Sequence, residues 1–125
     1  MPIQATAWSE SAPPANTTAG KIRGTIENGV NAFKGVAYGG DTANPRFTAP
    51  VPAAPWKDVL KHVAPQLAVR SGGAAPQGAP NAGAQSEDCL HLNVWTGGLR
   101  DGRRRPVVVY FHGGAYNKGT VNSDL

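Results

Sequence analysis

One segment limits the possible folds of this chain more than any other. It reads Pro106-Val-Val-Val-Tyr-Phe-His112 and runs directly into Gly113-Gly114. Such a near-continuous run of β-branched and aromatic residues is typical of a strand buried on both faces of a sheet. Sheets of that kind are covered by helices, so the run predicts an α/β protein. We expect a buried strand over residues 107–111, with chemistry at the turn where it ends.

The rest of the chain offers little to cover such a strand. Of its 125 residues, 16 are glycine and 11 are proline, and strongly core-forming residues are few. A core of that size is doubtful for a self-sufficient domain. The net charge of +4, with 16% charged residues, is nevertheless too mild for a typical disordered chain. The composition therefore leaves two interpretations, a loop-rich small domain or a piece of something larger, and the uncovered strand favours the second.

Local patterns predict the organisation of the remaining residues. Residues 1–19 are polar, small and interrupted by proline, and we expect a flexible lead-in. Two short β-prone runs, 20–27 and 30–38, flank Asn28-Gly29, which is a strong signal for a hairpin. The other expectations are a proline-stiffened extended path over 39–55, either two helical turns or a short strand over 56–63, a surface loop over 71–85, and a β segment over 91–96.

The glycine turn after the apolar run has three possible interpretations. The segment Gly114–Thr120 approaches the phosphate-binding loop pattern, but Lys118 precedes the second glycine instead of following it, which disfavours a phosphate site. Two glycines also end a strand simply because the chain must turn tightly there. In the third interpretation, the consecutive N–H groups of His112-Gly113-Gly114-Ala115 form an oxyanion hole for acyl transfer.

Further segments favour the third interpretation. Ser86-Glu-Asp-Cys-Leu-His-Leu-Asn-Val-Trp95 lies upstream of the turn, Phe33-Lys-Gly-Val-Ala-Tyr38 follows the predicted hairpin turn, and Arg46-Phe47 precedes Pro50, Pro52 and Trp56. In this order the motifs resemble those of the type-B carboxylesterase and cholinesterase family of α/β-hydrolases. The resemblance implies the N-terminal portion of that fold: a small antiparallel hairpin sheet plus the first strands of the central sheet. Residues 20–125 would form an incomplete part of one such domain.

The resemblance also implies roles for individual residues. Gly114 and Ala115 would donate the oxyanion-hole N–H groups, and Gly113 would shape the turn. The structural residues would be Arg46, Glu87, Asp88 and Cys89. Glu87 would pair with Arg46, and Asp88 would accept hydrogen bonds from nearby backbone. Family members often pair the signature cysteine with an upstream one, but Ala64 stands at that position here, so we expect Cys89 to be a free, buried thiol.

The catalytic triad that the resemblance implies is not present in this sequence. The five serines, Ser9, Ser11, Ser71, Ser86 and Ser123, all lack the flanking glycines of a Gly-x-Ser-x-Gly elbow. We therefore expect the N-terminal fragment of a several times longer serine carboxylesterase that hydrolyses carboxylic esters by acyl transfer, with the 125-residue chain inactive alone. The alternative is an esterase-like binding or adhesion module that has lost catalysis.

Other partners receive little support from the sequence. Arg103, Arg104 and Arg105 form the one basic cluster, but no aromatic residue interleaves with it, so we expect no nucleic-acid binding. No apolar stretch is long enough for a membrane span, and no signal peptide is visible, which favours a cytoplasmic location. The histidines show no metal-ligand spacing, so no metal or cofactor is expected. A small-molecule ester would be the partner of the complete protein, and the oligomeric state is open.

Overall fold

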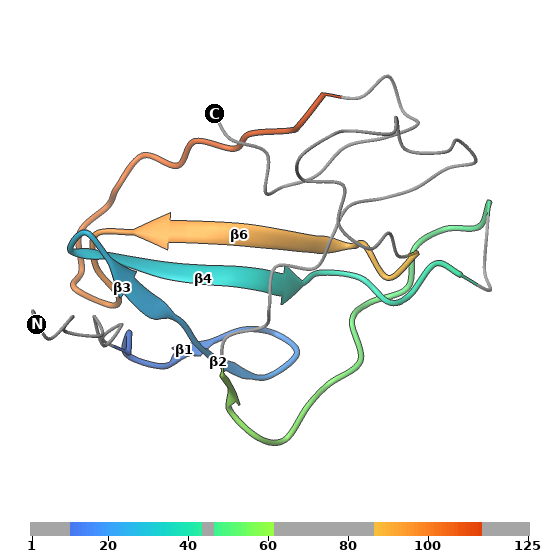
Figure 1. Cartoon of the computed structure of the whole chain (residues 1–125), viewed down its shortest axis with the longest axis horizontal. Coiled ribbons are helices and arrows are strands. Elements are labelled where there is room, and N and C mark those ends of the chain that lie inside the picture. Colours follow the sequence, from blue (N-terminus) through green and yellow to red (C-terminus); the bar gives the residue numbers. More distant parts are fainter. Residues whose placement is uncertain (1–10, 44–46, 62–86, 114–125) are drawn as a thin grey trace, which may run out of the picture.

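The computed structural model describes residues 11–43, 47–61 and 87–113, which form strands and connecting segments without a helix. The strands are β1 (Ala15–Asn16), β2 (Lys21–Arg23), β3 (Thr25–Glu27), β4 (Val30–Ala37), β5 (Leu60–Lys61) and β6 (His91–Thr96). They form two three-stranded sheets, in the orders β1-β2-β5 and β3-β4-β6 (Figure 1). The second sheet is antiparallel throughout and contains the longest strands.

The hairpin predicted around Asn28-Gly29 is confirmed as β3 and β4. The two turn residues have φ angles of 50° and 78°, which asparagine and glycine adopt more readily than other residues. The first β-prone run is divided, however, because Gly24 separates β2 from β3 and the two strands enter different sheets. A Cβ atom at Gly24 would collide with the carbonyl group of Ala32, so the chain crosses β4 closely at this point.

The β segment predicted over residues 91–96 is confirmed as β6, which pairs with β4 (Figure 1). Phe33 lies opposite Val94, and Val36 lies opposite Leu92, so β4 contains one more residue than β6 over this interval. The extra residue makes a β-bulge, and Gly35 adopts a φ of 70° in it. This pairing joins the Phe33–Tyr38 motif to the signature segment.

A small apolar core lies between the two sheets. Ala12, Ile22 and Phe33 are 2%, 7% and 3% exposed, and partly buried side chains pack against them. Trp56 is one of these, and its indole N–H donates to the carbonyl of Lys21 at 2.8 Å. The core therefore joins residues from both sheets and from the proline-rich segment that leads to β5.

The expected flexible lead-in over residues 1–19 differs from the structure in its second half. Residues 11–19 belong to the fold: Ala12 is buried, β1 pairs with β2, and the Ala12 N–H donates to the carbonyl of Gly24 at 3.0 Å. The small side chains of Ala12 and Ala15 pack in and against the core, although the sequence pattern favoured flexibility. Residues 1–10 lie outside the described ranges.

The expected buried strand over residues 107–111 is wrong for this structure. The segment is extended and pairs with no strand in the described part of the chain (Figure 1). Its side chains are 61–93% exposed, from Tyr110 at the lower limit to Val108 at the upper one. A strand exists only when its backbone groups bond to neighbours, and none of the described segments takes up that position. The apolar pattern correctly indicates an extended backbone over residues 107–111, but it does not identify the strand with which this segment would pair.

Two further expectations concern the segment after the prolines. Residues 56–63 were predicted to form either helical turns or a short strand, and residues 60–61 form the strand β5, parallel to β2. His62 and Val63, like the loop predicted over 71–85, lie outside the described residues. Within the described ranges, no helix is long and apolar enough to cross a membrane.

Candidate functional site

The structure describes the beginning of the predicted oxyanion loop. Gly113 is exposed, and a Cβ atom there would meet no atom within 4 Å, so its surroundings leave space for another group. Gly114 and Ala115, the predicted oxyanion donors, lie outside the described residues. The glycine turn therefore remains a prediction for those two positions.

His112 directly precedes this turn and is half-buried. Its ring nitrogen Nδ1 lies 2.7 Å from the carbonyl oxygen of Gly113, so a proton on Nδ1 makes a hydrogen bond to that oxygen. The peptide unit is planar, and holding its carbonyl therefore fixes the orientation of the whole unit. His112 thus restrains the backbone at the entry to the glycine turn, and its Nε2 atom acts as an acceptor in this tautomer.

The signature segment is tied to the chain that follows β4. The Thr42 hydroxyl donates to the carbonyl of Glu87 at 2.6 Å, and the Tyr38 N–H donates to the carbonyl of Leu90 at 3.0 Å. The predicted ion pair between Glu87 and Arg46 is not tested, because Arg46 lies outside the described residues. Backbone and hydroxyl contacts thus hold the segment that leads into β6.

Cys89 is unpaired, as predicted, although it is half-buried and not fully enclosed. Burial raises the pKa of its thiol, and the nearby carboxylates of Glu87, Asp88 and Asp41 act in the same direction, while hydrogen bonding to Thr42 opposes them. A thiol that resists ionisation is a poor nucleophile. Cys89 is therefore better suited to packing than to covalent catalysis.

His91, at the start of β6, has a buried ring. Its side chain is 9% exposed, and Nδ1 has no hydrogen-bond partner among the described residues. Oδ1 of Asp88 is 4.0 Å from this nitrogen, which is beyond hydrogen-bond range. This geometry does not orient the imidazole as a triad base. In the described ranges, no group of three or more His, Cys, Asp or Glu side chains is placed to hold a metal ion.

One contact between two of the motifs was not predicted from the sequence. The side-chain oxygen Oδ1 of Asn93 accepts a hydrogen bond of 2.9 Å from the backbone N–H of Gly35, at the bulge of β4. The glycine provides the left-handed conformation, and the asparagine satisfies the N–H that the bulge removes from the ladder. The sequence signal that could have indicated this contact is the presence of both motifs, Phe33-x-Gly35 and Leu90-x-Leu-Asn93, in one chain.

Comparisons with known proteins agree with the resemblance. A model of the carboxylesterase family matches residues 11–124. The chain is 40% identical, over 88% of its length, to a phenmedipham hydrolase from Pseudarthrobacter oxydans, of which it covers 23%. It is 36% identical, over 87% of its length, to the para-nitrobenzyl esterase of Bacillus subtilis, of which it covers 22%.

The solved structures give the same result for the fold. An esterase from Clostridium hathewayi superposes on this chain with a TM-score of 0.73 and 34% identity, covering 90% of this chain and 23% of that one. The sheets correspond to the N-terminal portion of esterase structures, which confirms the predicted fold class. The chain spans less than a quarter of the length of the relatives described here.

Proposed function

Because the chain belongs to the carboxylesterase family and its relatives include a para-nitrobenzyl esterase, we propose that it is the N-terminal part of a serine carboxylesterase. In this proposal residues 20–125 are an incomplete part of a single α/β-hydrolase domain, and the complete protein acts on small-molecule carboxylic esters. The proposal accounts for the short length of the chain relative to its relatives. It also accounts for the exposed apolar segment over residues 107–111, which the rest of such a domain would cover.

The observation that carries this proposal is the position of His112-Gly113-Gly114-Ala115 within the matched region, directly after an apolar β-type segment. A serine supplied by the remainder of the enzyme attacks the ester carbonyl, and its proton passes to a histidine. The N–H groups of Gly114 and Ala115 stabilise the oxyanion, and the protonated histidine releases the alcohol. Water then hydrolyses the acyl-enzyme to the acid and restores the serine.

His112 would act as a positioning residue in this mechanism. It holds the carbonyl of Gly113 at 2.7 Å, and in a planar trans peptide the carbonyl and the following N–H point in opposite directions. In this proposal the restraint would keep the first oxyanion donor directed towards the substrate before the ester binds. Preorganised donors stabilise a transition state without the cost of reorientation during the reaction.

Proline substitution at the predicted donor tests the proposal in the complete enzyme. Ala115→Pro removes one backbone N–H, and we expect kcat to fall about 10²–10³-fold, the usual loss for one oxyanion donor. Ala115→Gly keeps the N–H and serves as the matched control, with kcat within a few-fold of the unmodified enzyme. Equal losses in the two variants would show that the position acts through packing and not through its N–H group.

The chain alone provides a second test. We expect no turnover of p-nitrophenyl acetate above a heat-denatured control, because none of its serines lies in a nucleophile elbow. Turnover that a serine-directed fluorophosphonate abolishes would contradict this. The alternative, an esterase-like binding module, predicts that the corresponding elbow of the complete protein carries a residue other than serine.

A further inference from the structure

The basic character of this chain is concentrated in one loop. Residues 97–105 contain four arginines and one aspartate, a net charge of +3, whereas the whole chain carries +4. Only +1 is therefore distributed over all other residues. The loop follows β6 directly and precedes the extended segment over residues 107–111. A local charge of this size creates a distinct electrostatic surface on a chain that is otherwise nearly balanced.

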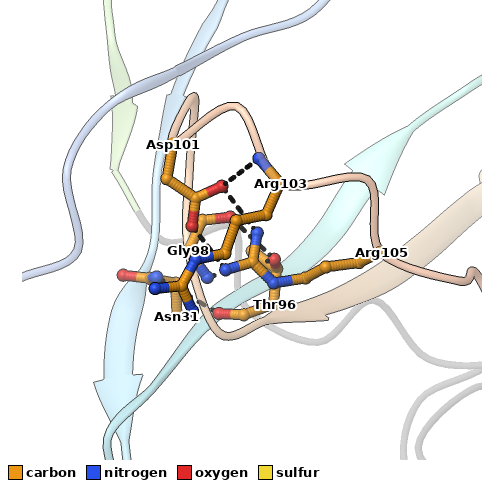
Figure 2. Close-up of polar contacts among 6 residues, drawn as sticks. All are labelled: Asn31, Thr96, Gly98, Asp101, Arg103 and Arg105. Atoms are coloured by element: carbon orange, nitrogen blue, oxygen red, sulfur yellow. Dashed lines mark hydrogen bonds and ion pairs between the residues drawn. The ribbon is translucent and has the colours of Figure 1, made fainter.

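The single acid of the loop is engaged by the loop itself (Figure 2). Oδ1 of Asp101 accepts hydrogen bonds from the Arg103 N–H at 3.1 Å and from Nη1 of Arg105 at 2.7 Å, and Oδ2 pairs with Nη2 of the same guanidinium. This bidentate pair holds the pKa of Asp101 at about 2, so the carboxylate stays ionised at neutral pH. Asp101 thus neutralises Arg105 alone and fixes the turn between them.

The loop is also braced where it leaves β6. The Thr96 hydroxyl donates to the carbonyl of Gly98 at 2.9 Å, and Nδ2 of Asn31 donates to the carbonyl of Thr96 at 3.2 Å (Figure 2). Leu99 packs against the core, which anchors the chain just before the arginines. Arg100 and Gly102 then adopt left-handed conformations, with φ angles of 51° and 70°. These contacts hold the backbone of the loop in one shape.

Three arginines remain available on this braced backbone. Arg100, Arg103 and Arg104 are exposed, and their guanidinium groups contact no carboxylate in the part of the chain that the structure describes. They lie within five consecutive residues, so their Cα atoms span at most about 15 Å. We propose that the loop over residues 97–105 is a docking surface for an acidic segment of a partner protein, with these three guanidinium groups as the carboxylate-binding groups.

The surroundings of the loop favour an acidic protein segment over other polyanions. The loop contains no aromatic side chain on which a base could stack, and three phosphate contacts provide little nucleic-acid affinity at physiological salt. Its one large apolar residue, Leu99, is packed inward and is not available to insert into a lipid bilayer. Guanidinium groups bind carboxylates through paired hydrogen bonds, which a short run of Asp or Glu provides.

The proposed surface is separate from His112 and Gly113, the described residues at the start of the predicted oxyanion loop. In Figure 1 the loop lies beside the hairpin turn of β3 and β4, whereas the extended segment leads away from it towards Gly113. Docking at the loop therefore does not depend on ester hydrolysis. A failure of either proposal leaves the other intact, because the binding assay below measures no turnover.

Fluorescence anisotropy of a fluorescein-labelled oligoglutamate peptide, titrated with the full 125-residue chain, tests the proposal. The loop variant is Arg100→Gln, Arg103→Gln, Arg104→Gln. The matched control is Lys21→Gln, Arg23→Gln, Lys57→Gln, which removes the same charge outside the loop. We expect the loop variant to weaken binding about tenfold and the control to stay within about twofold, since exposed pairs contribute modestly. Tryptophan emission of each variant verifies that the fold is retained.

The competing explanations give different results in the same assay. Equal weakening in both variants would overturn the proposal in favour of overall charge, and absence of oligoglutamate binding would overturn it outright. Tighter binding of oligothymidylate would indicate a nucleic-acid surface instead. Tighter binding of phosphatidylcholine vesicles that contain phosphatidylserine would indicate a membrane surface. Support requires that oligoglutamate binds most tightly and that the loss is confined to the loop variant.

Discussion

Replacing Gly29 with alanine measures how much the β3–β4 hairpin depends on its turn conformation. Gly29 has a φ of 78°, and a Cβ atom there would meet nothing within 4 Å. Gly97 is a matched control, because its Cβ position is equally open but its φ lies outside the left-handed region. Both substitutions therefore add a methyl group to open space, but only Gly29 has a left-handed backbone conformation.

The expected magnitude follows from this difference. The left-handed conformation costs a residue with a side chain roughly 1–2 kcal/mol. Alanine in place of glycine also restricts the unfolded chain, which stabilises either variant by about 0.4–1 kcal/mol. We expect the free energy of unfolding to be about 1–2 kcal/mol lower for Gly29→Ala than for Gly97→Ala, with Gly97→Ala unchanged or slightly stabilised.

Urea unfolding followed by tryptophan fluorescence measures this difference. With an m-value of about 1–3 kcal/mol/M, the midpoint of Gly29→Ala should lie roughly 0.5–1 M below that of Gly97→Ala. Hydrogen exchange of the β3–β4 ladder amides gives a local measurement, and exchange should be about 5–30-fold faster in Gly29→Ala. Equal midpoints and equal exchange rates in the two variants would refute the assigned role of the turn.

Three further predictions concern the core, the loop and the thiol. Phe33→Ala should lower the free energy of unfolding by about 3–5 kcal/mol in urea denaturation, because the ring is 3% exposed between the two sheets; a loss below 1 kcal/mol would contradict this. The pKa of Asp101 is about 2 in the folded chain against an ordinary 3.8, so the ionised carboxylate stabilises the fold fully above about pH 4 and this stabilisation is lost as the pH falls towards 2. The urea midpoint of Asp101→Asn should therefore fall less than that of the unmodified chain between pH 4 and pH 2. Equal falls in the two midpoints would argue against the role of this carboxylate. Because the pKa of Cys89 is raised, its alkylation by iodoacetamide at pH 8 should be slower in the folded chain than in urea, and equal rates would show an open thiol.

Features that depend on neighbouring residues were predictable from the sequence. Asn28-Gly29 indicates the hairpin because both residues tolerate a positive φ, and the structure places the turn there. The apolar run over residues 91–96 likewise becomes β6. The family motifs identify the fold to which these strands belong. Local stereochemistry and motif order are therefore sufficient for this part of the chain.

Features that depend on residues far apart in the sequence could not be predicted from local sequence patterns. The bond from Gly35 to Asn93 connects positions 58 residues apart, and no local pattern specifies that pair. The segment over residues 107–111 has the composition of a buried strand, yet its burial depends on a neighbour that composition does not identify. Residues 11–19 appeared flexible because small residues and prolines give no periodic signal, although Ala12 is 2% exposed in the core.

The pairing of β4 with β6 has a consequence for the growing chain on the ribosome. Asn31 bonds to the carbonyl of Thr96, which is 65 residues later in the sequence. At about 5–20 residues per second, the edge of β4 waits roughly 3–13 s after its synthesis before its partner strand exists. During that interval the hairpin can close, but Phe33 has no Val94 beside it. The nascent β4 edge is therefore unpaired during this interval, and an unpaired strand edge is open to pairing with other chains until β6 has been synthesised.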